Sequence, residues 1–412
     1  MLSHEDNELL TRVEGSAPMG AYLREYWTPA VRSERMVADG APVKVRLFGE
    51  NFVAFRATDG TVGFLDEACP HRGASLALAR NEDCALRCIY HGWKIDVSGA
   101  VVEVPSEPAE RLVDMADKIA IGKYPSREAG GVLWVYLGSH DDPPPFPRFP
   151  FADVPADHVR ALAAETNCNW LQAVEGTLDS SHVSILHQSW LGQSSGSLGE
   201  TAEDSAPRYE SDETGYGIRF AAIRHAGADR MHVRVTEFVM PWTAYIPTGD
   251  EDRIAIIGTP IDDEHSRQWF IRWNDDHPLT EDTDTHFWYH DLTVAPDDFA
   301  ALTRGKDNWG QDRALMSEGH FSGFKNLILE DVAIQESQGP IVDRSREKLG
   351  TSDIAVVKTR RLLLNSVRSH QQRGDVFGQE DPLARPGSAG VAMTLEPTDD
   401  WRAAASTEAR YV

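Results

Sequence analysis

The sequence is poor in cysteine, has no long apolar run and carries few basic residues for its acidic content. Only 4 of its 412 residues are cysteines, and three of them lie between residues 69 and 88. So sparse a set does not build a disulfide scaffold, whereas crowded thiols in a reducing compartment are typical of metal ligands. No run of about 18 apolar residues is present, and the first residues lack the basic and apolar parts of a signal peptide. We therefore expect a cytoplasmic protein that is not inserted in a membrane.

The charge balance narrows the class of partner. Acidic residues outnumber basic ones by 65 to 40, which gives a formal net charge of −25. A binder of nucleic acid needs a basic surface to neutralise phosphates, so this composition argues against one. With 41 % hydrophobic residues the chain has enough apolar material to fold throughout, and its length predicts two domains.

Changes in sequence texture divide the chain into three segments. Residues 1–40 predict short helices that pack on the larger, C-terminal domain. Residues 41–145 alternate apolar and polar positions between turn signals such as "GEN" and "TDG", which predicts a small all-β domain. A proline-rich connector ends it, and residues 146–412 form the third segment.

The third segment predicts an α+β domain, with strands in the middle and helices outside them. Helices are expected around residues 170–190, strands from 209 to 273, and further helices to about 372. The Gly/Ser-rich stretch 192–206 predicts a loop, and the C-terminus predicts a polar, mobile tail.

The first set of candidate metal ligands consists of Cys69, His71, Cys88 and His91, spaced C-x-H, sixteen residues, C-x-x-H. A structural zinc finger begins with a cysteine pair and ends with a histidine pair, so these mixed pairs fit it poorly. A Rieske 2Fe-2S centre holds one iron with two thiolates and the other with two imidazoles, which matches one Cys and one His from each of two loops. Cys84 and Cys168 stand outside the pattern and are expected to be small buried apolar residues.

These residues and their neighbours resemble a known family. The stretches "CPHRGASL" and "CIYHGWKID" are similar to the Rieske domain of ring-hydroxylating oxygenases. The resemblance implies that Cys69 and Cys88 bind one iron, that His71 and His91 bind the other, and that the cluster passes single electrons.

A second constellation lies in "NWLQAVEGTLDSSHVSILHQSW", where Asp179, His182 and His187 are spaced D-x-x-H-x₄-H on a predicted helix. Asp179 and His182 share a face of that helix, but His182 and His187 would point about 140° apart. If both histidines bind one ion, the sequence predicts a kink or π-bulge between Val183 and Leu186. Two histidines and one carboxylate are the ligands of non-haem iron(II) oxygenases, so a carboxylate must come from elsewhere.

Among the acids of the stretch "KNLILEDVAIQESQGPIVDRSREKLGTSD" are Glu330, Asp331, Glu336, Asp343 and Glu347, and pattern alone does not choose among these five. Both stretches resemble the iron site of the phthalate dioxygenase-like branch of the same family. That resemblance implies Asp331 as the iron ligand, and it leaves Glu330 on a solvated helix face.

The resemblance also implies a role for Asp179 and a set of partners. In this family the electron crosses a subunit interface, so Asp179 would bridge His182 of its own subunit to His91 of a neighbour's cluster. A homotrimer, in some members stacked into a hexamer, and a separate FMN/2Fe-2S reductase or a ferredoxin are implied with it. No nucleotide-binding G-x-G-x-x-G after a strand was found, so NAD(P)H would act through that reductase.

Three arginines are candidate substrate contacts. Arg208, Arg224 and Arg234 lie in the strand region, and a guanidinium pairs well with the carboxylate of a carboxylated aromatic compound.

The function expected from these features is that of a terminal oxygenase (alpha) subunit. The resemblance implies a Rieske domain followed by a helix-grip catalytic domain with a central antiparallel sheet. It implies one 2Fe-2S cluster, one mononuclear iron(II), and dioxygen as co-substrate in the catabolism of a small aromatic compound. The reaction is either cis-dihydroxylation of the ring or oxidative O- or N-dealkylation. The alternatives are a Rieske electron-transfer protein without oxygenase activity and a zinc protein.

Overall fold

The structure is a computed structural model, and it describes most of the chain. The described residues are 2–108, 111, 118–140, 142–191, 197–227, 229–248, 252–280, 303, 306–379 and 389–407. Within these ranges no helix is both long and apolar enough to cross a bilayer.

The chain divides into two compact units. Leu23–Pro144 forms one, here called the β unit, and Met1–Tyr22 with Pro145–Val412 forms the other, here called the α+β unit. The expected N-terminal segment 1–40 is thus split between them, because its end completes a sheet of the β unit. There β1 (Thr28–Arg32) pairs antiparallel with β10 (Val132–Val135).

The β unit consists of three small antiparallel sheets with the orders β1-β10-β9, β2-β3-β4 and β5-β6-β7-β8. The remaining strands are β2 (Val43–Leu47), β3 (Glu50–Arg56), β4 (Val62–Asp66), β5 (Arg80–Glu82), β6 (Ala85–Arg87), β7 (Lys94–Asp96), β8 (Val101–Glu103) and β9 (Ser126–Ala129).

Tight turns join these strands at positions with positive φ, as two-residue hairpins require. Phe48 and Gly49 link β2 to β3, and Asp83 and Cys84 link β5 to β6. The expectation that Cys84 is buried was therefore wrong, since this turn leaves it partly exposed.

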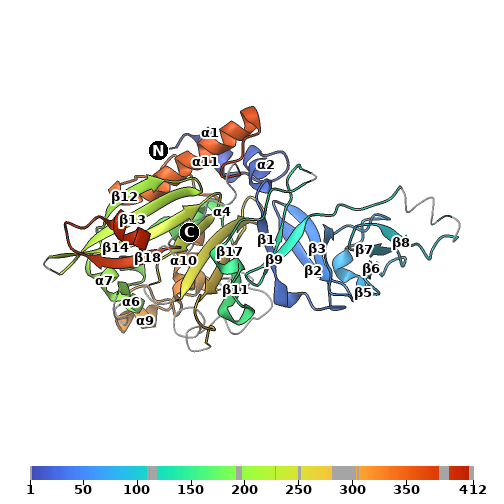
Figure 1. Ribbon diagram of the computed structural model, residues 1–412, viewed down its shortest axis with the longest axis horizontal. Coiled ribbons are helices and arrows are strands. Elements are labelled where there is room, and N and C mark those ends of the chain that lie inside the picture. Colours follow the sequence, from blue (N-terminus) through green and yellow to red (C-terminus); the bar gives the residue numbers. More distant parts are fainter. Residues whose placement is uncertain are drawn as a thin grey trace. The chain divides into compact units, whose positions relative to one another are not determined.

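The α+β unit is built on one antiparallel sheet, shown in Figure 1, with the order β11-β17-β16-β15-β14-β13-β12. Its strands are β11 (Val159–Thr166), β12 (Arg208–Glu213), β13 (Gly217–Ala226), β14 (Arg230–Val239), β15 (Thr243–Ile246), β16 (Arg253–Pro260) and β17 (Ser266–Trp273). The predicted strand region and the predicted α+β fold class are confirmed.

Helices pack against this sheet and position the candidate iron ligands. Contacts join α4 to β15, β16 and β17, and join α10 to α4. The helices of the unit are α1 (His4–Thr11), α2 (Pro18–Arg24, where the two units divide), α4 (Trp170–Leu178), α5 (Val183–Leu186), α6 (Gln188–Leu191), α7 (Ser197–Glu203), α9 (Arg313–Ser317), α10 (Leu327–Ser337), α11 (Ile354–Arg373) and α12 (Trp401–Thr407).

Two expectations for this unit were wrong. The stretch predicted as a loop from 192 to 206 contains α7; residues 192–196 lie outside the described part. The end of the chain is not a mobile tail over residues 389–407. There β18 (Val391–Leu395) pairs with β14, and Trp401 of α12 packs on apolar side chains of β13 and β14.

Candidate metal centres

Two similar turns present the four ligand candidates of the β unit. The turns begin at Cys69 and Cys88, whose side chains are buried within the apolar core of the unit. The amide of Gly73 donates to the carbonyl of Cys69 at 2.8 Å, and the amide of Gly92 donates to that of Cys88 at 2.9 Å. Both glycines have positive φ, of 74° and 78°, which residues with a Cβ rarely adopt.

The histidines of the two turns lie together. The ring centroids of His71 and His91 are 4.5 Å apart, and Trp93 stacks on His71 at 4.7 Å. His71 Nδ1 is buried and has no hydrogen-bond partner among the described residues. Burial, and then the neighbouring Cys88, raise the pKa of Cys69 to about 11. A close thiol pair and an unpaired buried imidazole nitrogen are the donors that a 2Fe-2S cluster with mixed ligands needs.

The chain bends sharply at the candidate iron histidines of the α+β unit. Helix α4 ends at Leu178, and Asp179 has extended backbone with ψ of 101°. His182 directly precedes the four-residue helix α5, and His187 directly follows it. The predicted kink between Val183 and Leu186 was wrong, because those residues form a regular turn and the breaks lie at its ends. These breaks bring the ring centroids of the two histidines to 5.0 Å.

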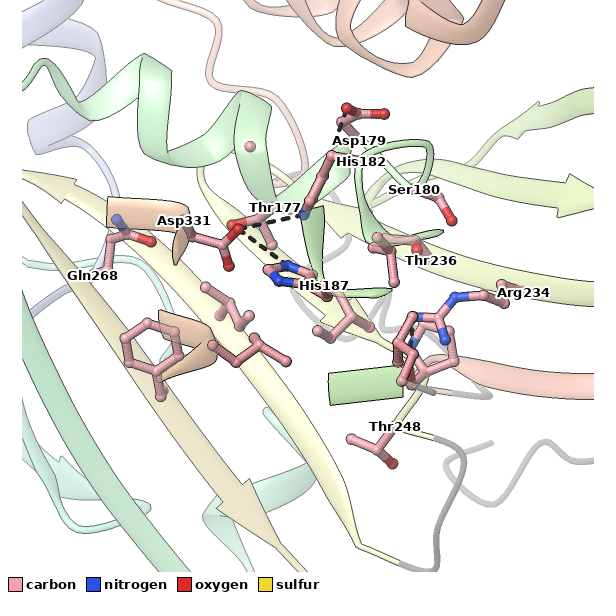
Figure 2. Close-up of a pocket in the computed structure, with 18 of the residues that line it drawn as sticks. Thr177, Asp179, Ser180, His182, His187, Arg234, Thr236, Thr248, Gln268 and Asp331 are labelled. Carbon is pink, nitrogen blue, oxygen red and sulfur yellow. Dashed lines mark hydrogen bonds and ion pairs between the residues drawn. The ribbon is translucent and has the colours of Figure 1, made fainter. Parts of the chain in front are cut away.

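Asp331 on α10 completes a cluster with the two histidines. Its Oδ1 lies 3.4 Å from His182 Nε2 and 3.2 Å from His187 Nε2. One ligand atom from each of the three residues lies within 4.8 Å of the others, and Figure 2 shows the side chains converging. Asn326 caps the helix that carries Asp331 by accepting from the amides of Ile328 and Leu329.

The electrostatics of this cluster suit a divalent metal. Burial acts to lower the pKa of His182, but Asp179 and Asp331 raise it to about 10. The pKa of His187 is raised, since Asp331 and Glu330 outweigh its burial. Burial likewise opposes the ionisation of Asp331, yet the two imidazoles hold the pKa of its carboxyl far below the usual range. The carboxylate is thus ionised and faces two nitrogens, the donor set of a non-haem iron site.

Asp179 lies on the other side of His182. Its Oδ2 is 3.5 Å from His182 Nδ1, the nitrogen that does not face Asp331. Burial raises the pKa of Asp179, but hydrogen bonding to His182 outweighs this, so the pKa is lowered. Asp179 lines two cavities, and His182 lines both of them as well.

Glu330 does not lie on a solvated helix face, so that expectation was wrong. The residue is fully buried, and its Oε2 lies 2.6 Å from Nδ1 of His187. Glu330 of α10 contacts Nδ1 of His187, whereas the adjacent Asp331 faces Nε2 of His187 and lines the cavity. Sequence analysis gave Glu330 no partner because only the fold brings His187 to it.

The other acids weighed as ligands lie elsewhere. Glu336 accepts hydrogen bonds from Asn167 and from Thr303. Asp343 is bonded to Ser345, and Glu347 pairs with Arg360 at 2.6 Å. None of these three belongs to the described cluster around His182.

The candidate iron ligands open into a cavity of the α+β unit. Its empty space, together with the open solvent at its mouth, is about 940 Å³. Apolar side chains form much of the wall: Val183, Leu191, Ile246, Ile256, Phe270 and Leu327. Gln268 and Gln335, which sequence analysis did not single out, line it close to Asp331 and bond to each other at 2.7 Å.

The three candidate arginines differ in position. Arg208 is exposed and pairs with Glu210. Arg224 is buried, but it donates to the carbonyl of Ser180 at 2.6 Å and holds the backbone next to Asp179. Arg234 lines the cavity and lies, in Figure 2, beyond His187 as seen from Asp331.

Arg234 is a buried cation without a carboxylate partner among the described residues. It donates to the carbonyl of Pro247 at 3.0 Å, and its Nε has no partner there. Burial, and then Arg224, lower the pKa of Arg234 to about 9. The charged form is thus unfavourable when alone, so an anion in the cavity would stabilise it.

Two family models match the chain. The model "Rieske [2Fe-2S] domain" matches residues 26–125, and "LigXa C-terminal domain like" matches residues 135–411.

Similar proteins are oxygenase subunits. The "Phthalate 4,5-dioxygenase oxygenase subunit" of Pseudomonas putida is 41 % identical over 100 % of this chain and 96 % of its own length. The "3-chlorobenzoate-3,4-dioxygenase oxygenase subunit" of Comamonas testosteroni is 36 % identical, over 97 % of each chain. Among solved structures, NdmB of Pseudomonas putida CBB5 has a TM-score of 0.63 at 20 % identity, covering 94 % of this chain and 99 % of that one.

Proposed function

This chain belongs to the Rieske non-haem iron ring-hydroxylating oxygenases as a terminal oxygenase subunit, and from that premise we propose its site residues and its class of substrate. As a member it uses one Rieske cluster, one mononuclear iron, dioxygen and electrons from NAD(P)H that arrive through a reductase. We assign the cluster to Cys69, His71, Cys88 and His91, and the iron to His182, His187 and Asp331. We propose a carboxylated aromatic ring as the substrate.

The observation that carries the proposal is a single cavity with two kinds of polar group. His182, His187 and Asp331 open into it, and so does Arg234. The apolar wall between them suits an aromatic ring. A guanidinium that binds the substrate carboxylate would fix the distance and orientation of that ring relative to the three ligands.

The proposed chemistry divides the work between the bound groups and the residues. When bound, the iron supplies the place where dioxygen is reduced beside the ring, and the cluster supplies electrons. The side chains of the cavity orient the ring and exclude water. Overall, an aromatic ring, dioxygen, NAD(P)H and one proton give a cis-dihydrodiol and NAD(P)⁺, so both oxygen atoms enter the product.

The substrate proposal also draws on relatives. The printed names of two similar oxygenase subunits contain phthalate and 3-chlorobenzoate, which are both aromatic carboxylates. Arg234 meets the physical requirement for such a substrate, since a carboxylate would give its unpaired Nε a partner in a buried place. Arg208 and Arg224 remain assigned to surface and backbone contacts.

We propose that Asp179 passes the electron between subunits of a homotrimer, which in some assemblies stacks into a hexamer. In support, Asp179 lines a second cavity beside His182, and Ile334 and Leu349, which also line it, are 45 % and 38 % exposed. Beside His91, Ile89 and Tyr90 are 63 % and 56 % exposed. Apolar exposure of this extent at both places suits contacts between copies.

The electron donor is proposed to be a separate FMN/2Fe-2S reductase or a ferredoxin. The proposed localisation is the cytoplasm. A solved relative is an oxygenase–ferredoxin complex, which supports a donor of this kind. None of the four cysteines is in a disulfide in the structure, which is compatible with a reducing compartment. The alternative function, an electron carrier without oxygenase activity, does not account for the cavity or for the convergence of His182, His187 and Asp331 in it.

Product analysis after a single turnover tests the proposal without a partner protein. The full chain, loaded with both metals and reduced with dithionite, is mixed with labelled dioxygen and a panel of benzoates, methoxybenzoates and their amides. We expect product from the acids and none from the amides, with two labelled oxygens in a cis-diol. Release of formaldehyde from methoxybenzoates, with one labelled oxygen atom of dioxygen recovered as water, would identify dealkylation instead. Turnover of amides as fast as acids would refute the carboxylate proposal.

A further inference from the structure

We propose that Glu330 is a positioning residue for the mononuclear iron, acting through His187. This inference rests on the proposed iron site. The Glu330 carboxylate would accept the Nδ1 proton of His187, fix the ring plane, and leave Nε2 free to bind the metal. Neither the family comparisons nor the ligand spacing assigns Glu330 this role.

The geometry clamps the His187 ring from both ends. Its Nδ1 lies 2.6 Å from Glu330 Oε2, and its Nε2 lies 3.2 Å from Asp331 Oδ1. Only 3 % of His187 is exposed and none of Glu330. A short, dry hydrogen bond at one nitrogen therefore determines which nitrogen faces the site.

The second oxygen of Glu330 is also occupied. The Ser322 hydroxyl donates to Oε1, and Ser322 is itself buried. The amide of Phe324 donates to the same hydroxyl at 3.2 Å, so the segment before α10 holds the serine in place. With both oxygens engaged, Glu330 is not free to bind the metal, although it is adjacent to Asp331.

The charge of Glu330 also requires a partner. Among the ion pairs of the described residues, Glu330 has His187 as its partner and no lysine or arginine. A buried carboxylate without compensation is costly. Positive charge at His187, supplied in the loaded site by the metal on its other nitrogen, is the compensation that this arrangement provides.

His182, the other candidate histidine ligand, is held differently. Asp179 lies 3.5 Å from His182, and the two side chains are 29 % and 23 % exposed. Asp179 belongs to the break after α4, whereas Glu330 belongs to the capped helix α10. Both imidazoles line the cavity, but His187 is almost fully buried against Glu330, whereas His182 is partly exposed beside Asp179.

A matched pair of variants tests the role. Glu330→Gln keeps the shape but replaces the carboxylate, and Glu336→Gln makes the same change at a buried acid of the same helix that bonds to Asn167 and Thr303. In the full chain with its cluster intact, the iron(II) dissociation constant is measured by competition with a chelator. We expect it to rise by about 10- to 100-fold in Glu330→Gln. In Glu336→Gln we expect it to be unchanged.

A spectroscopic reading separates positioning from folding. The nitric oxide complex of the mononuclear iron should change its resonance in Glu330→Gln and keep it in Glu336→Gln. Ser322→Ala, which frees one oxygen of Glu330, should weaken iron binding to a smaller extent. Equal iron affinity and an unchanged nitrosyl spectrum in Glu330→Gln would overturn the proposal, as would equal losses of affinity in both glutamine variants.

Asp331→Ala distinguishes failure of the positioning role of Glu330 from failure of the proposed iron site. We expect Asp331→Ala to lose the mononuclear iron while the cluster remains. If Asp331→Ala keeps that iron, the proposed site itself is wrong. If Asp331→Ala loses the iron while Glu330→Gln binds it as tightly as the unaltered protein, only the positioning role fails.

Discussion

The two candidate metal centres are assembled in opposite ways. In the β unit all four ligand candidates lie between Cys69 and His91, on two turns of the same form. In the α+β unit, the histidines flank α5 and the carboxylate comes from α10, far along the sequence. The first centre therefore depends on local hairpins, and the second depends on the packing of α4 and α10 against the sheet.

The surroundings of the two centres differ as well. The exposed residues Ile89 and Tyr90 directly precede the candidate cluster ligand His91, whereas His187 is almost fully buried. An electron can be delivered to the surface of a protein, but dioxygen chemistry requires a dry, enclosed place. The difference is what an electron relay and a catalytic pocket need, and it predicts that each centre can be removed without the other.

The largest effect is expected from Cys88→Ser. A serine hydroxyl is a poor substitute for a thiolate, so the variant should lose the cluster with its visible absorption. The mononuclear iron should remain, as detected by its nitric oxide complex. Cys84→Ser, in the β5–β6 turn, is the control and should keep both centres. Loss of both metals in Cys88→Ser would break the comparison between independent centres.

Asp179→Asn tests the proposed electron transfer between the two centres. The amide cannot replace the carboxylate that faces His182 Nδ1, so we expect both metals to stay bound and turnover to fall by at least about 10- to 100-fold. The measurement is the rate of cluster oxidation by dioxygen in the presence of substrate. Asp343→Asn, at an exposed acid bonded to Ser345, serves as the control. Near-normal oxidation in Asp179→Asn would exclude the electron bridge.

Arg234→Gln should affect substrate binding alone. A hydrogen bond between charged groups contributes about 1.5–3 kcal/mol, so KM for the acid should rise about 10- to 150-fold. Binding of the matching amide should change little. Arg208→Gln, at the exposed arginine beside Glu210, provides the comparison. If KM for the acid is the same in both variants, Arg234 does not bind the carboxylate.

The smallest effect is expected at a surface contact of the α+β unit that touches neither metal. Hydrogen bonds from Trp401, Arg208 and Arg402 lower the pKa of Glu210 to about 2. Because the pKa is lowered on folding, this stabilisation is present at neutral pH and is lost as the pH falls from about 4.5 towards 2.

Arg402→Gln should therefore lower the free energy of unfolding by no more than about 1 kcal/mol at pH 7 and by less at pH 3. Chemical denaturation at the two pH values measures this difference. Both metal centres should be unchanged, and loss of either would mean that the docking of α12 supports them.

The sequence predicted local features of the fold well, for physical reasons. Alternating polarity and turn residues predicted the β unit, since hairpin geometry is determined by neighbouring residues. The α+β class was predicted from the strand-rich region between helices. Helix α7 and strand β18 were missed: α7 lies in a Gly/Ser-rich stretch, and β18 is defined by its pairing with β14.

Only part of the geometry of the candidate iron site could be predicted from the sequence, because the rest depends on contacts between distant segments. The spacing of His182 and His187 on an ideal helix required a distortion if both bind one ion, and the predicted bend lay inside α5 rather than at its ends. The choice between Glu330 and Asp331 came from resemblance, because adjacent acids on a helix are equivalent until the partner of each is known. Only the fold shows that Glu330 turns inward to His187 and that Arg234 has no carboxylate partner among the described residues.

Iron content in paired preparations tests the account most directly. The unaltered chain should hold about three irons, two in the cluster and one at His182, His187 and Asp331. His182→Ala should hold about two, with the rhombic resonance of the reduced cluster unchanged. An iron content that His182→Ala does not alter, or a cluster resonance that disappears with it, would contradict the assignment of two separate centres.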